Sequence, residues 1–267
     1  MASMDRKGLA AVGVALWLLM RAVGASAQSL WADPAFALYQ QAAEAFNRKE
    51  YDRAADLARE AIGHYPEHLL AYYLLGQAAL AGSNWDEAAR AFSKVVRLYP
   101  RSFAGHRELG LALVQVKRLD EAAAALEAAL RLRPDAEEIQ VRLAFLSLQA
   151  GKQDRAFALL KGLADRGTRE PEVWYALGRL YYDRDDFTAS ERAFNQAVAL
   201  RDEGNTWFNL GVVRMRLEDH EGALKAFERA ARDPDLREQA SRELERIREY
   251  RKALEPPRPG MERPRTR

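Results

Sequence analysis

Histidines and closely spaced carboxylates are the residues of this 267-residue chain that could bind a metal or carry acid–base chemistry. His64 and His68 are four residues apart, which on a helix would supply half of a metal site. Pro66 lies between them, so this segment is predicted to be a turn. His106 and His220 occupy positions where similar segments carry aromatic residues, so both are predicted to be packing residues. No metal site is predicted.

Carboxylates also gather at Asp183, Asp185 and Asp186, but these fall in a predicted turn, where a solvated surface is the ordinary explanation. The sequence has no phosphate-binding glycine-rich loop and no G-x-S-x-G motif. It has no cysteine, which excludes disulfides, thiol catalysis and cysteine-ligated metals. We therefore predict no catalytic residue and no cofactor, and we do not expect an enzyme.

The composition, 48% hydrophobic and 30% charged, is that of a folded chain, and helix-forming Ala, Leu, Glu and Arg dominate it. The net charge of +2 is unevenly distributed. Residues 1–27 carry +2 and residues 251–267 carry +4, which leaves about −4 on the body between them. An acidic body does not suit a phosphate backbone, so no nucleic-acid partner is expected.

The elements that position these residues recur with a period close to 34. Tyr72-x-x-Leu75-Gly76 is followed by Ala88, Phe92 and Pro100, and the pattern returns one period later with Gly110, Ala122, Leu126 and Pro134. Counterparts occur on both sides, and six units of this kind cover residues 35–237. The predicted unit boundaries are 35–68, 69–102, 103–136, 137–170, 171–203 and 204–237.

This spacing resembles the tetratricopeptide repeat, a helix–turn–helix unit that stacks on its neighbours. The resemblance implies an all-α fold: a right-handed superhelical solenoid of antiparallel helix pairs. We expect the glycines to let the two helices of a pair approach, with alanines such as Ala88 as small partners across the contact. At Ser190 and Thr168 the pattern is broken, and local looseness is expected there.

The N-terminal 27 residues have the order of a secretory signal. Arg6 and Lys7 precede an apolar run from Gly8 to Met20, and Ala25-Ser26-Ala27 ends the segment. Cleavage is predicted after Ala27, giving a periplasmic or secreted protein of bacterial type with no stable membrane span. The alternative is an inner-membrane anchor formed by residues 8–27, which would place Arg21 inside the membrane.

The regions that flank the repeats are predicted as follows. Residues 28–34 form a lead-in, and Asp33-Pro34 is a good start for the first helix. Asp233-Pro234 is predicted to open a last helix, whose residues 238–254 cap the final repeat with one apolar stripe and leave the other face in water. Residues 255–267 are too rich in proline and charge to fold and form either a plain tail or a basic tether.

With no active site predicted, the surface of the first helices is the candidate for function. In this family the first helix of each pair lines the concave side. Three positions per repeat, here called the row residues, should form a groove: Tyr39, Ala43, Phe46, Tyr73, Gln77, Leu80, Arg107, Leu111, Val114, Val141, Phe145, Leu148, Tyr175, Arg179, Tyr182, Phe208, Val212 and Met215. The alternative is that many of them pack against the adjacent repeat.

Ten row residues are predicted to contact a partner segment: Tyr39, Phe46, Tyr73, Gln77, Arg107, Phe145, Tyr175, Arg179, Tyr182 and Phe208. One subset of this family binds acidic tails through Lys and Asn at the first two positions of these rows, which here contain neither. The predicted function is a non-enzymatic periplasmic adaptor for a protein or peptide. The alternatives are an envelope-assembly factor resembling those of pilus and secretin biogenesis, or a scaffolding subunit of a cell-envelope enzyme. Self-association is also possible.

Overall fold

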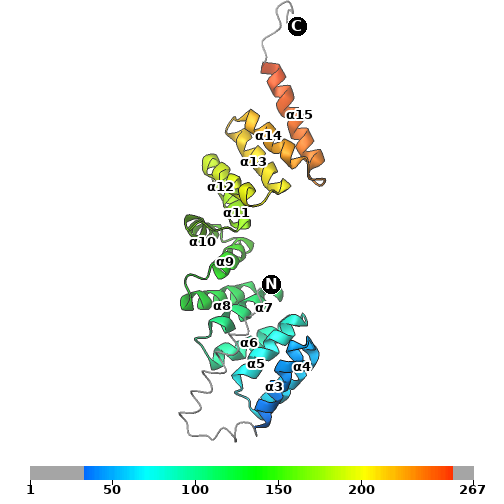
Figure 1. Ribbon diagram of the computed structural model, residues 1–267. Coiled ribbons are helices and arrows are strands. Elements are labelled where there is room, and N and C mark those ends of the chain that lie inside the picture. The colour runs from blue at the N-terminus through cyan, green and yellow to red at the C-terminus, as the bar shows by residue number, and fades with distance from the viewer. Residues whose placement is uncertain (1–32, 255–267) are drawn as a thin grey trace, which may run out of the picture. The chain divides into compact units, whose positions relative to one another are not determined.

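A computed structural model of the chain describes residues 33–254, which form thirteen α-helices and no strand (Figure 1). The predicted signal segment, most of the lead-in and the tail lie outside these residues and stay predictions. Between residues 33 and 254, no helix combines the length and the apolar character that crossing a bilayer requires.

The chain divides into two compact units, Met1–Asp135 and Ala136–Arg267. Unit 1 contains α3 (Pro34–Asn47), α4 (Tyr51–His64), α5 (Leu69–Ala81), α6 (Trp85–Leu98), α7 (Phe103–Gln115) and α8 (Leu119–Leu132). Unit 2 contains α9 (Glu137–Gln149), α10 (Gln153–Asp165), α11 (Pro171–Tyr182), α12 (Phe187–Leu200), α13 (Gly204–Arg216), α14 (His220–Ala230) and α15 (Arg237–Leu254).

Within each unit, consecutive helices form antiparallel pairs that stack on the next pair (Figure 1). The pairs are α3/α4, α5/α6 and α7/α8 in unit 1, and α9/α10, α11/α12 and α13/α14 in unit 2. The chain enters the first pair as predicted, because α3 begins at Pro34 and the side chain of Asp33 accepts a hydrogen bond from the Ala35 amide. The predicted all-α solenoid of helix pairs is confirmed.

The repeat glycines make room for a large side chain of the second helix. A Cβ atom on Gly76 would lie 2.7 Å from the ring of Phe92, sixteen residues further along the chain. The same clash would occur at Gly178 with the ring of Phe194, again at 2.7 Å. Ala88, the predicted partner, is fully buried but is not among the atoms nearest to this position. The glycine is therefore required by the buried ring.

Two repeats carry alanine in the glycine position, and the residue sixteen positions later is then smaller. Ala42 shares a buried cluster with Ala58, and Ala144 shares one with Leu160. In the third repeat, Gly110 accommodates Leu126. At this position of the second helix, phenylalanine therefore occurs only where the residue sixteen positions before it, on the first helix, is glycine.

The turn inside every pair contains one residue in the left-handed backbone region. These residues lie a repeat period apart: Lys49 (φ 65°), Ser83 (φ 60°), Lys117 (φ 60°), Gly151 (φ 70°), Asp185 (φ 58°) and Glu218 (φ 61°). The left-handed residue lets the chain reverse within three or four residues, and only one of the six is glycine, the residue for which this conformation is easiest.

The expected looseness at Ser190 and Thr168 is wrong. Ser190 is fully buried and its hydroxyl donates to the carbonyl of Gly178 at 2.7 Å, which ties α12 to α11. Thr168 is 7% exposed, and its hydroxyl donates to Glu137. Its carbonyl accepts from the indole of Trp174 at 3.0 Å. At Ser190 the hydroxyl replaces apolar packing, and at Thr168 it stands in the place of a proline. At both positions the hydroxyl makes a hydrogen bond to a residue of a neighbouring helix.

The last helix begins later than the predicted start at Asp233-Pro234. Asp233 instead lies in a turn between α14 and α15: its amide donates to the carbonyl of Ala230 at 3.0 Å, and its side chain accepts from the Asp235 amide at 3.0 Å. α15 starts at Arg237 and buries Ala240, Leu244 and Ile247. These three side chains share a cluster with Phe227 of α14, so α15 covers the last pair.

Candidate partner-binding surface

The eighteen row residues all lie on the first helices of the pairs, and none of them is fully buried. Seventeen are half-buried and Arg179 is exposed. Directly beneath them, three phenylalanines of the second helices are closed off from solvent, with Phe92 at 0%, Phe194 at 1% and Phe227 at 1% exposed. Each unit therefore presents a partly accessible apolar surface above a sealed core.

Three aromatic row residues stand edge-on against these buried rings. The ring centroids are 5.5 Å apart for Tyr73 and Phe92, and 5.7 Å apart for Tyr175 and Phe194. Phe208 and Phe227 are 5.2 Å apart. Edge-to-face pairs at such distances are favourable beyond the area that they bury. The exposed aromatic rings are thus held in place by the core.

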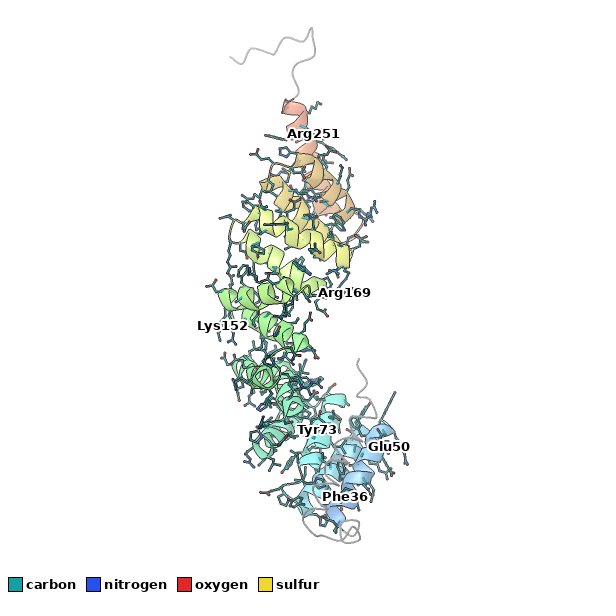
Figure 2. All side chains as sticks on the ribbon, turned by 60° about the vertical axis from the view of Figure 1, so that its left-hand side comes forward. Phe36, Glu50, Tyr73, Lys152, Arg169 and Arg251 are labelled. Carbon is teal, nitrogen blue, oxygen red and sulfur yellow. The ribbon has the colours of Figure 1, made fainter. Side chains whose placement is uncertain are left out.

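In unit 1, the structure brings Tyr73, Gln77 and Arg107 together (Figure 2 labels Tyr73). Burial raises the pKa of Tyr73 to about 12, and the charge of Glu108 adds to this rise. The charge of Arg107 and the nearby side chain of Gln77 act in the opposite direction. Arg107 donates from Nε to Glu108 at 3.1 Å, so its charge is already compensated by a buried carboxylate.

The other two predicted residues of unit 1 lie on α3 with partners of their own. Tyr39 packs against the ring of His68 at 5.3 Å, and Phe46 packs against Tyr51 at 5.5 Å. Neither residue makes a described ring contact with Tyr73. Unit 1 thus offers a polar-edged aromatic cluster on α5 and α7 and separate aromatic contacts on α3.

In unit 2, Tyr175, Arg179 and Tyr182 line one cavity of about 310 Å³ between α11 and α13. Asn209 forms the opposite wall and donates to the Tyr175 hydroxyl at 3.2 Å. Phe194 lies at the base. The exposed guanidinium of Arg179 stands beside two tyrosine rings, a combination suited to a peptide segment with both apolar and polar groups.

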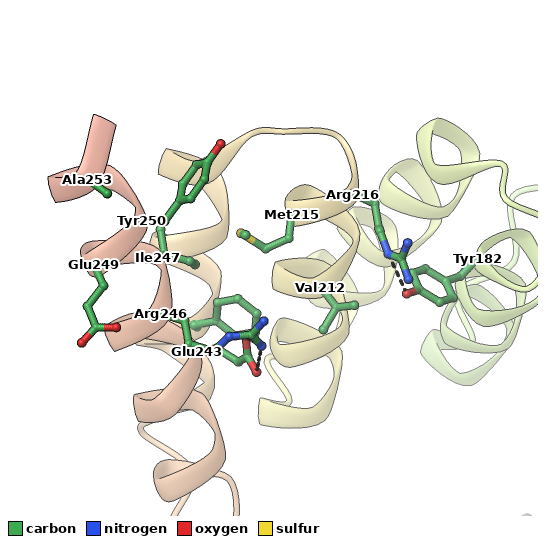
Figure 3. Close-up of a pocket in the computed structure, with 11 residues that line it drawn as sticks. Tyr182, Val212, Met215, Arg216, Glu243, Arg246, Ile247, Glu249, Tyr250 and Ala253 are labelled. Carbon is green, nitrogen blue, oxygen red and sulfur yellow. Dashed lines mark hydrogen bonds and ion pairs between the residues drawn. The ribbon is translucent and has the colours of Figure 1, made fainter. Parts of the chain in front are cut away.

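A larger cavity, of about 830 Å³, lies between α13 and α15 and was not predicted (Figure 3). Met215 points from α13 toward α15, where Ile247 and Tyr250 form the other wall. On the α11 side, Arg216 donates from Nε to the Tyr182 hydroxyl at 3.2 Å. Tyr250 is 50% exposed. This tyrosine, an aromatic residue among Arg and Glu on α15, was the signal in the sequence that could have revealed the cavity.

Phe145 and Phe208 do not line the cavity that Tyr175 shares with Arg179. Phe145 packs with Leu148 around the buried core of α9–α12, and Phe208 packs beneath α15. The ten predicted residues are thus divided between the two units, and within each unit only some of them are neighbours.

The histidine pair does not form a site of its own. His64 is the last residue of α4, whereas His68 caps the start of α5, and its Nδ1 accepts from the Ala71 amide at 3.3 Å. Burial lowers the pKa of His68. Residues 33–254 contain no group of three or more His, Asp or Glu side chains placed to hold a metal ion.

Comparisons with known proteins agree with this architecture. Two family models, both described as tetratricopeptide repeat, match the chain, one at residues 39–103 and 175–237 and the other at residues 113–180. No curated protein sequence matches the chain.

Several solved structures have the same fold. A MamA structure from Desulfovibrio magneticus RS-1 is 22% identical, with a TM-score of 0.55, and the match covers 67% of this chain and 95% of that one. YrrB, described as a TPR protein with an unusual peptide-binding site, is 18% identical with a TM-score of 0.58, covering 74% and 93%. The C-terminal part of a repeat protein from Cytophaga hutchinsonii is 14% identical with a TM-score of 0.61, covering 72% and 77%.

The six helix pairs, the glycine positions that admit a buried ring and the family matches across most of residues 39–237 lead to one assignment. The chain belongs to the tetratricopeptide repeat family.

Proposed function

We propose that the protein is a non-enzymatic adaptor that binds a segment of a protein partner on the row residues of its first helices. The fold supports a protein–protein interaction scaffold. The observation that carries the proposal is the exposure of these rows: eighteen positions, mostly apolar, stay partly accessible above a core whose phenylalanines are sealed.

The aromatic row residues are suited to act as anchors for a partner. Tyr73, Tyr175 and Phe208 are held edge-on by buried rings, so little side-chain entropy would be lost when a partner covers them. Aromatic residues that are already ordered and only partly covered are the type that contributes most at protein interfaces.

The test is a crosslinking pull-down from the native envelope with a triple variant, Tyr73→Val, Tyr175→Val and Phe208→Val. Valine is compatible with this position, because Val141 occupies it in the fourth repeat. The triple variant should keep the helical circular dichroism of the wild type and lose the captured partner. Retained capture would contradict the proposal.

A matched control removes aromatic rings away from the rows. Tyr65 and Tyr99 each follow a second helix and are 50% and 52% exposed. The double variant Tyr65→Val, Tyr99→Val should capture the same partner as the wild type. Loss of capture in this control would indicate that capture does not depend specifically on the row residues.

We also propose a periplasmic location, on the basis of the basic, apolar and small-residue order of residues 1–27. Fractionation of cells followed by N-terminal sequencing tests this. Mature protein beginning at Gln28 in the periplasmic fraction is the expected result, whereas intact protein in the membrane fraction would favour the anchor formed by residues 8–27.

A further inference from the structure

Another hollow, of about 650 Å³, lies in unit 1 between α6 and α8, with α7 as its floor (Figure 1 labels these helices). Leu109 and Leu113 of α7 contribute the apolar floor, and Ala124, Ala125 and Ala128 contribute a smooth wall on α8. The residues of α7 that line it are turned by roughly 130° around the helix from Arg107 and its row neighbours, at 100° per residue. This hollow, here called the basic groove, is therefore distinct from the row residues.

The opposite wall of the basic groove is a stripe of three cations on α6. Arg90, Lys94 and Arg97 lie at positions i, i+4 and i+7, which places them on one face of the helix. Among residues 33–254, none of the three has a carboxylate partner. The one acidic residue that lines the groove, Glu121, is bound by Arg118 through two hydrogen bonds of 2.7 Å.

One of the two acidic residues that lie a turn before Arg90 on α6 is also occupied. Glu87 lies one turn before Arg90, but its carboxylate accepts two hydrogen bonds from Arg59 of α4, at 2.8 and 2.9 Å. Asp86, four residues before Arg90, makes no described ion pair with it and acts on the charge of Arg118. No ion pair is therefore described for the three cations, which stand beside an apolar floor.

The other repeats show that the fold does not require this charge. The same three positions are Asp56, Glu60 and Gly63 in the first repeat and Ala158, Gly162 and Asp165 in the fourth. In the sixth repeat they are again basic, but there Lys225 is paired with Glu221 at 2.9 Å and Arg229 with Asp202 at 2.5 Å. Only the second repeat therefore combines three cations at these positions with the absence of a described carboxylate partner.

We infer that the basic groove is a second docking site, which binds an acidic amphipathic segment of a partner protein. The acidic side chains of this partner segment pair with Arg90, Lys94 and Arg97, and its apolar side chains cover Leu109 and the alanines of α8. The positive charge of α6 favours a segment with acidic side chains. The apolar floor favours a peptide that also has an apolar stripe over a fully charged polyanion. The adaptor could then hold two partners at once, because the row residues lie on another face.

The experiment uses the full chain and a fluorescein-labelled 16-residue peptide that places leucine on one helical stripe and glutamate elsewhere. Fluorescence anisotropy is measured at 50 mM NaCl with wild type and with the triple reversal Arg90→Glu, Lys94→Glu, Arg97→Glu. Saturable binding by the wild type and a loss of at least tenfold in the variant are expected. A peptide with lysine in place of glutamate should not bind.

A matched control changes the overall charge equally at exposed positions of α15. The triple variant Arg237→Glu, Arg251→Glu, Lys252→Glu should bind within twofold of the wild type. Ala124→Trp fills the groove without altering charge and should weaken binding at least fivefold, which keeps the test valid if the reversal fails to fold. The row variant Tyr73→Val, Tyr175→Val, Phe208→Val should bind the peptide normally.

Three outcomes would overturn the inference. The first is no saturable binding of the glutamate–leucine peptide by the wild type. The second is equal loss in the α6 and α15 variants, which would mean that only net charge matters. The third is binding to phosphatidylglycerol vesicles that depends on Arg90, Lys94 and Arg97 while the peptide does not bind, which would assign the groove to a membrane surface.

Discussion

The pairing of a glycine with a buried ring predicts a compensated double substitution in the fifth repeat. Gly178→Ala places a methyl group 2.7 Å from the ring of Phe194, which is 1% exposed, so the ring has to shift. Overpacking of this kind costs about 1–3 kcal/mol. The gain in helix propensity from glycine to alanine returns about 1 kcal/mol. The two effects together give an expected net loss of about 0–2 kcal/mol in the free energy of unfolding.

A second substitution should remove most of this loss. Leucine at this position accepts either neighbour, because Leu160 coexists with Ala144 and Leu126 with Gly110. Phe194→Leu alone should cost about 1–2 kcal/mol through the smaller buried side chain. The double variant Gly178→Ala, Phe194→Leu should be no less stable than Phe194→Leu alone, which corresponds to a coupling of about 1–2 kcal/mol between the two positions.

Urea unfolding followed by circular dichroism gives the overall effect, and native-state hydrogen exchange gives the local one in α11 and α12. Both are needed because repeat arrays do not always unfold in a single step. Gly63→Ala is the matched control: nothing lies within 4 Å of its Cβ position, so stability should rise by about 0.5–1 kcal/mol. If the effects of Gly178→Ala and Phe194→Leu simply add, the ring is not the reason for the glycine.

The remaining predictions concern charge and hydrogen bonding. Tyr73 should ionise at about pH 12, measured by absorbance at 295 nm. The contribution of its raised pKa to the stability of the folded state is complete below pH 10 and is lost as the pH rises toward 12. Tyr73→Phe should abolish this pH dependence. Thr168→Val should lower the free energy of unfolding by about 1–2 kcal/mol, because the bond to Glu137 is lost, and normal exchange protection at the start of α11 would refute this. Arg59→Ala should cost about 0.5–1 kcal/mol at low salt and less at 1 M NaCl, because the pair with Glu87 is partly exposed; an effect independent of salt would contradict it.

Much of the fold could be predicted from the sequence because it depends on spacing. The period of Gly76, Gly110 and their counterparts fixed the number and order of the helix pairs. The start of α3 was predictable from Asp33 and Pro34, since capping depends only on neighbouring residues. The same dipeptide at Asp233-Pro234 gave a wrong helix start, because Asp233 accepts the same kind of hydrogen bond there but the chain makes a turn before α15 begins at Arg237.

The parts that could not be predicted depend on contacts between helices. Whether Gly76 faces Ala88 or Phe92 is decided by how far the two helices are rotated about their axes. Thr168 and Ser190 looked like defects because their partners, Glu137 and Gly178, are remote in the sequence. The basic groove likewise requires residues of three helices to be brought together, which a pattern within one helix does not show.

The left-handed turn residues have a consequence for engineering the protein. Five of the six turns hold a side chain in a backbone conformation that costs a non-glycine residue about 1–2 kcal/mol. Replacing Lys49 or Lys117 by glycine would relieve that strain at a surface site, offset in part by the greater freedom of glycine in the unfolded chain. Substitutions in the turns inside the helix pairs could therefore raise the thermal stability of this scaffold without changing either candidate docking surface.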